Sequence, residues 1–224
     1  MGNSVIKINN LSKIYKEGVN EVHALENIDL TINQGEFTAI VGPSGSGKTT
    51  LLNMIGGLDT PSSGNIIVNQ TNLSSLSYNE LINFRRDNVG FVFQAYNLIP
   101  VLTALENVSF IMDLQNIPSK ISRKRAIELL ESVGLGDRIN SRPSKLSGGQ
   151  QQRVAVARAL ASKPKFILAD EPTANLDSKS AENLLDIMEQ LNRKENITFI
   201  FSTHDQRVMN KARRIIKLED GRVV

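Results

Sequence analysis

The residues best suited to chemistry form a glycine-rich loop between an apolar segment and a helical pattern. Residues 42–49 read Gly-Pro-Ser-Gly-Ser-Gly-Lys-Thr, which is the spacing of a phosphate-binding loop. Glycines let backbone N–H groups converge on phosphate oxygens, and the helix that follows directs its positive end at the same anion. Lys48 would neutralise the β- and γ-phosphates, and the Thr49 hydroxyl would hold Mg²⁺. The predicted phosphate-binding residues are Gly42, Pro43, Ser44, Gly45, Ser46, Gly47, Lys48, Thr49 and Thr50.

Two acidic side chains follow a second apolar segment. Residues 166–169 read Phe-Ile-Leu-Ala, and Asp170 and Glu171 come directly after them. In open α/β sheets the ligand binds at the carboxyl ends of the strands. Asp170 suits the Mg²⁺ shell because hard cations prefer oxygen ligands. Glu171 could act as a general base or polarise a water aimed at the γ-phosphate. An isolated Asp-Glu pair is usually two solvated acids, but the phosphate loop favours the catalytic interpretation.

The elements that must position these groups alternate between short apolar segments and helical patterns, which indicates a parallel α/β sheet. Strands are predicted at 5–8, 25–32, 37–41, 66–68, 89–93, 166–169 and 197–201, with a terminal strand pair in 214–224. Helices are predicted after the phosphate loop, at 104–114, at 123–133 and from about Ser147. The alternation of apolar and polar residues in 5–8 and 25–32 is typical of half-exposed strands in an antiparallel patch. We therefore expect an α/β core with a helical insertion.

Composition excludes several classes of protein. The 224 residues are 40% hydrophobic and 22% charged, as in soluble globular proteins that need no disulfide or structural metal. The absence of cysteine excludes zinc-thiolate sites and thiol catalysis. The apolar segments are too short to span a bilayer, and no secretory signal is visible. Basic residues cluster at 123–125 and between 207 and 214. Aromatic residues make up 5% of the chain and do not interleave with these clusters, so no nucleic-acid partner is expected.

Residues 146–153, Leu-Ser-Gly-Gly-Gln-Gln-Gln-Arg, resemble the signature of the ABC family of ATPases, which other phosphate-loop ATPases lack. Its expected form is a helix N-terminus capped by Ser147, with two glycines that allow close approach to an anion. In that family the signature binds the γ-phosphate held by a second subunit. The resemblance therefore implies a head-to-tail homodimer that encloses two ATP molecules, with Ser147, Gly148, Gly149 and Gln150 at the partner's nucleotide.

Further motifs match the same family. Gln94 resembles the Q-loop glutamine, which in the family contacts Mg²⁺ and the attacking water. Residues 174–177, Ala-Asn-Leu-Asp, resemble the D-loop at the dimer interface. His204 resembles the switch histidine at the γ-phosphate, and Tyr15 resembles the aromatic residue that stacks on adenine. His23 has no such counterpart and is interpreted as a structural or surface residue.

The resemblance extends from Tyr15 to His204 with every motif in place, so it implies a competent ATPase. It assigns Lys48, Gln94, Glu171 and His204 to catalysis and Thr49, Gln94 and Asp170 to Mg²⁺. It also implies one nucleotide-binding domain over residues 1–224, with a phosphate-loop NTPase (RecA-like) α/β core at 1–95 and 165–224. An antiparallel β subdomain and a helical signature subdomain at about 96–164 complete the expected fold.

A narrower resemblance concerns the membrane partner. Residues 22–25, 93–100, 102–103, 106–108 and 169–177 are similar to the lipoprotein-release and macrolide-export subfamily, and cell-division relatives share much of the pattern. The resemblance implies a cytoplasmic subunit on the inner face of the membrane, bound to a permease with few transmembrane helices and a large external domain. The work would be export, lipoprotein release or mechanotransmission. Apolar residues after Gln94 are expected to line the groove for the permease's coupling helix: Tyr96, Leu98, Ile99 and Leu102.

Two alternatives fit less well. An ABC ATPase without a transport role would act in DNA repair or translation, but such members carry coiled-coil or zinc insertions, or two ATPase units. This sequence has one copy of each motif and no cysteine. A purely regulatory nucleotide-binding module is disfavoured by the complete catalytic set.

Overall fold

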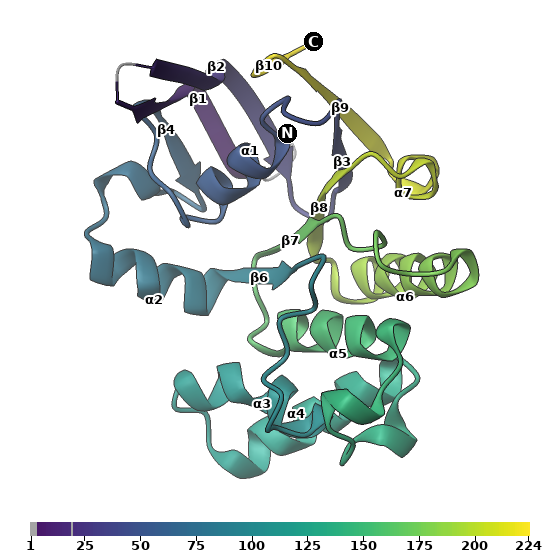
Figure 1. Ribbon diagram of the computed structural model, residues 1–224. Coiled ribbons are helices and arrows are strands. Elements are labelled where there is room, and N and C mark those ends of the chain that lie inside the picture. The colour runs from purple at the N-terminus through teal and green to yellow at the C-terminus, as the bar shows by residue number, and fades with distance from the viewer. Residues whose placement is uncertain (1–3, 19) are drawn as a thin grey trace.

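The computed structural model describes residues 4–18 and 20–224. In this part of the chain, six strands form the central sheet in the order β10-β9-β3-β8-β7-β6 (Figure 1). The strands are β3 (Phe37–Val41), β6 (Val89–Val92), β7 (Phe166–Asp170), β8 (Thr198–Thr203), β9 (Arg214–Glu219) and β10 (Arg222–Val223). All neighbours are parallel except β9 and β10. The predicted terminal strand pair is present, and β9 also joins the parallel sheet beside β3.

A second sheet has the order β2-β1-β4-β5 in the described part of the chain, and its strands pair in antiparallel fashion. Its strands are β1 (Ser4–Glu17), β2 (Asn20–Asn33), β4 (Ser63–Val68) and β5 (Thr71–Asn72). The first two strands are much longer than the predicted segments 5–8 and 25–32. Backbone pairing continues through polar residues because the outer ends of both strands lie on the surface, where apolar alternation is not required.

Helices surround the sheets and form the lower part of the molecule in Figure 1. They are α1 (Lys48–Ile55), α2 (Tyr78–Asn88), α3 (Ala104–Leu114), α4 (Ser119–Ser132), α5 (Gly148–Ala161), α6 (Ser178–Glu195) and α7 (Gln206–Lys211). Single 3₁₀ turns occur at Leu73–Ser75, Gly136–Arg138 and Pro143–Lys145. In the described residues, none of these helices is both long enough and apolar enough to span a membrane.

Helix α3 has the predicted ends, and α5 begins one residue after its predicted start. Thr103 and Ser147 each form a capping box, in which the side chain accepts from the third helical N–H and that residue's side chain returns to the cap. Such caps fix where a helix begins. The sequence analysis missed α2, α6 and α7, and α4 begins at Ser119, before its predicted start at residue 123. Helix α2 buries only Leu81 and Phe84, too few apolar residues for a recognisable helical pattern.

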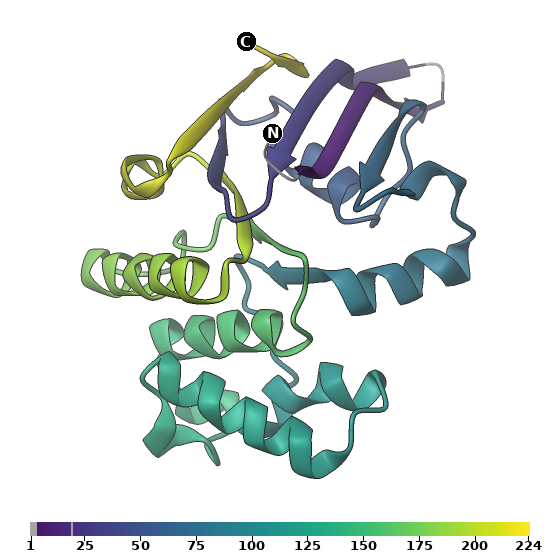
Figure 2. The same ribbon diagram turned by 180° about the vertical axis from the view of Figure 1, so that it is seen from behind.

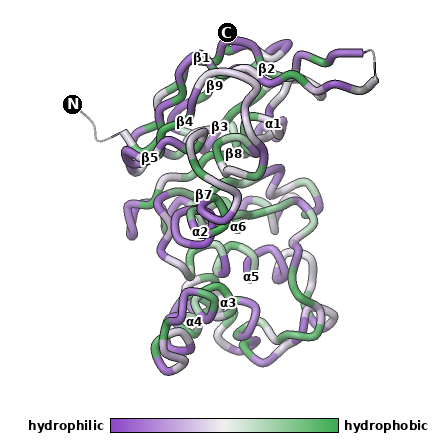
Figure 3. The backbone as a smooth tube through the Cα atoms, turned by 90° about the vertical axis from the view of Figure 1, so that its left-hand side faces the viewer, coloured by the Kyte–Doolittle hydropathy of each residue, from purple (hydrophilic) through white to green (hydrophobic). Residues whose placement is uncertain are grey.

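The central sheet separates two hydrophobic cores. On one face, Ile40 and Ile200 pack with α1 and the antiparallel sheet. On the other face, Phe37, Phe199 and Phe201 pack with the helices from α3 to α7. Figure 2 shows these two layers from behind, and Figure 3 shows hydrophobic segments concentrated along the central strands. Strand β3 is buried along its whole length, as predicted for a strand covered on both faces. Helices therefore cover one face of the central sheet, and the loops at the carboxyl ends of its strands carry the site.

Candidate active site

The glycine-rich loop joins the carboxyl end of β3 to the first residue of α1. Gly47 has a φ of +99°, and a Cβ at this position would lie 2.4 Å from the carbonyl oxygen of Ala24. Only glycine fits such a backbone without strain. The Lys48 ammonium donates to the carbonyl oxygens of Gly42 at 2.8 Å and Pro43 at 2.9 Å. Its positive charge therefore lies over the loop, next to the N-terminus of α1.

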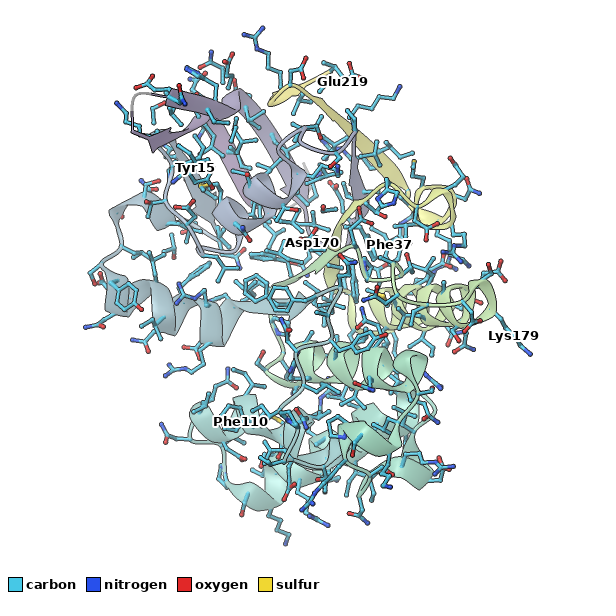
Figure 4. All side chains as sticks on the ribbon, in the orientation of Figure 1. Tyr15, Phe37, Phe110, Asp170, Lys179 and Glu219 are labelled. Carbon is cyan, nitrogen blue, oxygen red and sulfur yellow. The ribbon has the colours of Figure 1, made fainter. Side chains whose placement is uncertain are left out.

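Asp170 ends strand β7 and lies beside the phosphate loop. The Thr49 hydroxyl is 3.2 Å from Oδ2 and 3.4 Å from Oδ1 of Asp170. Strand β8 separates β7 from β3, yet the strands are parallel, so their carboxyl ends reach the same edge of the sheet. Figure 4 shows Asp170 near the middle of the molecule, where the loops from these strands meet (Figure 4). Two oxygen groups predicted to hold Mg²⁺ thus lie together.

Glu171 is held in place by neighbours at the carboxyl end of β8 and just after it. Its backbone φ is +44°, and its N–H donates to the Ser202 carbonyl at 2.9 Å. The Thr203 hydroxyl donates to Oε2 at 3.0 Å, and Nδ1 of His204 lies 2.7 Å from Oε1. The Glu171 side chain is 17% exposed, whereas that of His204 is 77% exposed. The Glu171 carboxylate is thus held by hydrogen bonds, while the His204 imidazole remains accessible to a ligand.

Asp205, which the sequence analysis missed, links the loop after β7 to the loop after β8 by hydrogen bonds. Its Oδ2 accepts from the Thr173 hydroxyl at 2.6 Å, and its carboxylate also binds the Arg207 guanidinium. The Arg207 guanidinium, helped by Thr173, lowers the pKa of Asp205 to about 2. A usable signal was present, since an Asp just before a short helical segment is a common N-cap.

A cavity of about 780 Å³ connects the glycine-rich loop, Glu171 and His204 to Tyr15, while Asp170 contacts Thr49 but does not line it. The Tyr15 ring is 40% exposed, its hydroxyl donates to Asp59 at 2.8 Å, and the Lys13 ammonium lies 4.7 Å from the ring centroid. Burial and the Asp59 carboxylate raise the pKa of Tyr15. The cavity is lined by Tyr15, Val22, His23, Ala24, Gly42, Pro43, Ser44, Gly45, Gly47, Lys48, Thr49, Thr50, Gln94, Glu171, Ser202 and His204.

The structure adds detail on two further residues near this cavity. His23 was interpreted as structural or surface; it is a surface residue, 3.3 Å from Glu26, and it also lines the cavity. Ser46 was assigned to the phosphate loop's binding residues, but it is buried and is absent from the lining. The Ser46 hydroxyl packs against Gly42, where an added Cβ would lie 2.7 Å from it.

The signature residues lie elsewhere in the chain's own fold. Among the described residues that line the cavity, none belongs to segment 147–150. Ser147 is exposed and caps α5, where its hydroxyl accepts from the Gln150 N–H at 3.3 Å. A Cβ on Gly148 would lie 2.7 Å from the Tyr96 hydroxyl, and one on Gly149 would lie 3.2 Å from Ser180. The N-terminus of α5 is therefore accessible at Ser147, and the two glycines that follow carry no side chain there.

The segment that follows β6 contributes residues to this cavity and to an apolar groove. Gln94 lines the cavity, and the Asn175 amide donates to the Gln94 carbonyl at 3.0 Å. Phe93 and Asn97 help to line the groove, a cavity of about 280 Å³ whose other lining residues are Val89, Gly90, Phe91, Phe110, Ile111, Leu114, Arg158, Ala159 and Ser162. Phe110 is 41% and Leu114 49% exposed, and Figure 4 shows Phe110 on the helical part of the molecule.

The residues predicted to line the permease's groove do not line this cavity. Tyr96, Leu98, Ile99 and Leu102 are partly exposed, as expected, but none of them belongs to its lining. Leu98 packs against the core under the helices, and the Tyr96 hydroxyl faces Gly148. The sequence analysis missed Phe110 and Leu114 because they belong to an amphipathic helix whose buried face was not distinguishable from its groove face by periodicity alone.

Taken together, the arrangement can bind a polyphosphate and position a water. The glycine loop, the Lys48 ammonium, the Thr49 hydroxyl and the Glu171 carboxylate line one cavity, and the Asp170 carboxylate contacts Thr49. That combination provides the positioning and charge stabilisation that phosphoryl transfer requires.

Comparisons with known proteins agree with this geometry. The family described as ABC transporter matches residues 25–174. The chain is similar to the lipoprotein-releasing system ATP-binding protein LolD of Pseudoalteromonas translucida, with 43% identity over 223 residues that cover 100% of this chain and 96% of the relative. It is also similar to the macrolide export ATP-binding/permease protein MacB of Paracoccus denitrificans, with 46% identity over 100% of this chain and 33% of the relative.

A solved structure matches almost the whole chain. It is a dimeric, post-hydrolysis state of an ATP-binding cassette of Methanocaldococcus jannaschii bound to ADP and Pi. The TM-score is 0.89 and the identity is 46%, over 97% of this chain and 96% of the other.

Proposed function

The chain belongs to the ABC transporter family as an ATP-hydrolysing subunit, and from this membership we propose how its own residues carry out the reaction. ATP would lie in the cavity of about 780 Å³, with its phosphates on the glycine loop and its adenine against Tyr15. Tyr15 supports this placement because its ring is partly exposed at the far end of the same cavity from Glu171. Lys48 would exchange its bonds to the loop carbonyls for bonds to the β- and γ-phosphates.

Thr49 and Asp170, with Gln94, would hold Mg²⁺. The contact between the Thr49 hydroxyl and the Asp170 carboxylate supports this, as does the preference of Mg²⁺ for few protein carboxylates when phosphates complete its shell. Among the described residues, no group of three or more His, Cys, Asp or Glu side chains could hold a metal alone. When bound, the ion would neutralise charge on the phosphates.

Glu171 would orient the attacking water or accept its proton. The observation that carries the proposal is the convergence of Thr49, Asp170 and Glu171 beside the glycine loop from strands that are far apart in the sequence. Thr203 and His204 hold the Glu171 carboxylate in one orientation. A base that is already positioned need not be ordered during the reaction. His204 is exposed enough to turn toward a γ-phosphate.

The second half of the site would come from another copy of the chain. Ser147 is exposed and Gly148 to Gln150 are partly exposed at the start of α5, outside the lining of their own chain's cavity, so a head-to-tail dimer would place them on the partner's γ-phosphate. The dimeric state of the similar cassette supports this arrangement. We further propose a single nucleotide-binding domain, with the helical subdomain at about 96–164 carrying the signature.

The work would be done on a separate permease. The groove lined by Phe93, Phe110 and Leu114 is apolar and partly exposed, which suits a short amphipathic helix of a membrane partner. Similarity to LolD and MacB supports a permease with few transmembrane helices and a large external domain. The subunit would then lie in the cytoplasm on the inner face of the membrane and drive export, lipoprotein release or mechanotransmission. Neither relative is a DNA-repair or ribosomal ATPase.

Replacing Glu171 by Gln tests the hydrolytic site. The variant keeps the shape of the side chain but loses its basicity, so turnover should fall at least ~10²-fold while ATP affinity is retained. ATP that is not consumed should also trap the dimer, and gel filtration with ATP and Mg²⁺ would show a shift from monomer to dimer.

Glu182→Gln is the control, because Glu182 lies on α6 outside the cavity lining. It should hydrolyse ATP like the unchanged protein and form no trapped dimer. Hydrolysis by Glu171→Gln at the unchanged rate would remove Glu171 from its proposed role.

A further inference from the structure

The backbone of segment 93–97 is held by side chains from other elements. The Gln152 amide on α5 donates to the Phe93 carbonyl at 3.2 Å and to the Pro172 carbonyl at 2.7 Å. The Asn175 amide donates to the next carbonyl, that of Gln94. The segment therefore depends on contacts with α5 and with the loop after Glu171 for its position.

Arg158, further along α5, holds the other end of the segment. Its guanidinium donates to the carbonyl oxygens of Tyr96, at 2.9 Å, and Asn97. Both residues have left-handed backbones, with φ values of 54° and 50°. Such conformations cost free energy in non-glycine residues and persist where surrounding contacts enforce them. The two-pronged guanidinium is suited to this task because its donors are fixed in one plane.

The environment of Arg158 is unusual for a charged side chain. It is partly buried, and burial lowers the pKa of its guanidinium. Among the described residues it forms no ion pair, and its hydrogen-bond partners are two backbone carbonyls. Partial burial of a charge without a counter-charge costs free energy, although a neutral donor would suffice to fix two carbonyls.

The position of Arg158 relates two functional surfaces. Helix α5 begins at the signature, where Gly148 faces the Tyr96 hydroxyl. The same helix ends near the apolar groove, where Arg158 and Asn97 are both part of the lining. A displacement of α5 would consequently be passed to segment 93–97 through Gly148, Gln152 and Arg158, and from there to the groove.

We infer that Arg158 is a positioning residue that makes segment 93–97 follow α5, so that dimer closure at the signature reshapes the groove. The inference rests on the proposed function, because it takes the signature to meet ATP in a dimer. It goes further in assigning transmission to a side chain that lies outside the nucleotide cavity and at the edge of the groove. Without its guanidinium, the dimer should still close while the groove no longer responds.

A tryptophan in the groove makes this measurable without the permease. The chain contains no Trp and no Cys, so Phe110→Trp provides a single emitter in the groove. In the Glu171→Gln background, ATP with Mg²⁺ should shift its emission as the dimer forms. Gel filtration of the same samples reports closure separately.

Arg158→Met removes the guanidinium and keeps an unbranched apolar stem. We expect ATP to dimerise this variant while the emission shift is lost. Arg125→Met is the matched control: Arg125 is also a partly buried arginine of the helical region, but it pairs with Glu195. It should keep the full shift, and thermal melting would show whether both variants are folded.

A second variant covers failure of Arg158→Met to fold. Arg158→Lys keeps the charge but provides one ammonium in place of a two-pronged donor, so its shift should be intermediate. In the protein that retains Glu171, Arg158→Lys should also lower kcat with an unchanged KM for ATP. The reason is that Gln94 belongs to segment 93–97, which the substitution would leave less firmly held.

Each outcome decides the inference. A full shift in Arg158→Met or Arg158→Lys overturns it, and so does an equal loss of the shift in Arg125→Met. A parent that dimerises without any shift also overturns it, since the groove would then be independent of closure. A parent that fails to dimerise contradicts the proposed function itself.

Discussion

Asp205 shows how one carboxylate fixes two loops that carry catalytic residues. It accepts from Thr173, two residues after Glu171, and it directly follows His204. The same carboxylate caps α7 by accepting from the Arg207 N–H at 2.9 Å. The distance between the loops after β7 and β8 therefore depends on a residue that does not line the nucleotide cavity.

The pKa of Asp205 predicts a pH-dependent contribution to stability. Its folded pKa of about 2 is below the ordinary 3.8, so the ionised form stabilises the fold above about pH 4, and this stabilisation is lost as pH falls through about 2. At one pKa unit per ~1.4 kcal/mol, the contribution is about 2 kcal/mol at most. Asp205→Asn should therefore lower the free energy of unfolding at neutral pH, and its deficit should shrink toward pH 2. Urea unfolding at several pH values would measure this.

Asp186→Asn is the appropriate comparison, because Asp186 forms an exposed pair with Lys211. Such surface pairs contribute only about 0–1 kcal/mol. A deficit for Asp205→Asn that stays constant from neutral to acidic pH would contradict the assigned role of its ionisation.

Helix α5 combines a cap, a signature and two internal donors in one element. Its start is fixed by the Ser147–Gln150 capping box, its middle by buried Gln152, and its end by Arg158. A single rigid element can thus present its N-terminus to one ligand and hold a loop near another. The arrangement follows from helix geometry, since residues along one helix keep fixed relative positions.

Ser147→Arg tests the part of α5 that faces outward. The new side chain would place bulk and charge where a partner's γ-phosphate should meet the helix, so ATPase activity should be lost. ATP affinity of the monomer should change by less than about 3-fold, which corresponds to ~0.6 kcal/mol, because Ser147 does not line its own chain's cavity. Fluorescence titration and a phosphate-release assay would measure the two quantities.

Ser147→Ala separates the steric effect from loss of the cap. Removing the cap alone costs about 1 kcal/mol of stability, so this variant should melt earlier but keep much more activity than Ser147→Arg. A large loss of monomer affinity in Ser147→Arg would mean that the signature acts within its own chain.

At the scale of the whole molecule, segment 93–97 contributes residues to both the proposed nucleotide cavity and the apolar groove. The parallel sheet brings its loops to the cavity, while α3 and α5 provide the groove. Tyr96 and Leu98 are poor probes of the groove, because one faces Gly148 and the other packs into the core. Phe110 and Leu114 are better probes because both are exposed.

Replacing Phe110 and Leu114 together with Ser should weaken binding to the permease. The double variant removes the exposed apolar area of the groove without touching the nucleotide cavity. Co-purification with the permease and stimulation by it should be lost, while ATP affinity stays unchanged. Ile121→Ser is the control, since Ile121 is 59% exposed on α4 outside the groove. Normal permease binding by the double variant would place the coupling surface elsewhere.

The sequence by itself determined the parts of this protein that depend on local spacing. The phosphate loop, the strand before Asp170, the bounds of α3, the cap of α5 and the signature are each contained in short stretches of consecutive residues. Backbone conformation, helix capping and strand burial are set by such short segments, which is why their positions were predicted closely.

Only the tertiary structure decided which distant side chains meet. That β8 lies between β3 and β7, that His204 contacts Glu171, that Asp205 binds Thr173 and that Arg158 holds Tyr96 could not be derived from the sequence. These contacts join residues separated by 32 or more positions. Local periodicity carries no information about them, because they depend on how whole elements pack around the two cores.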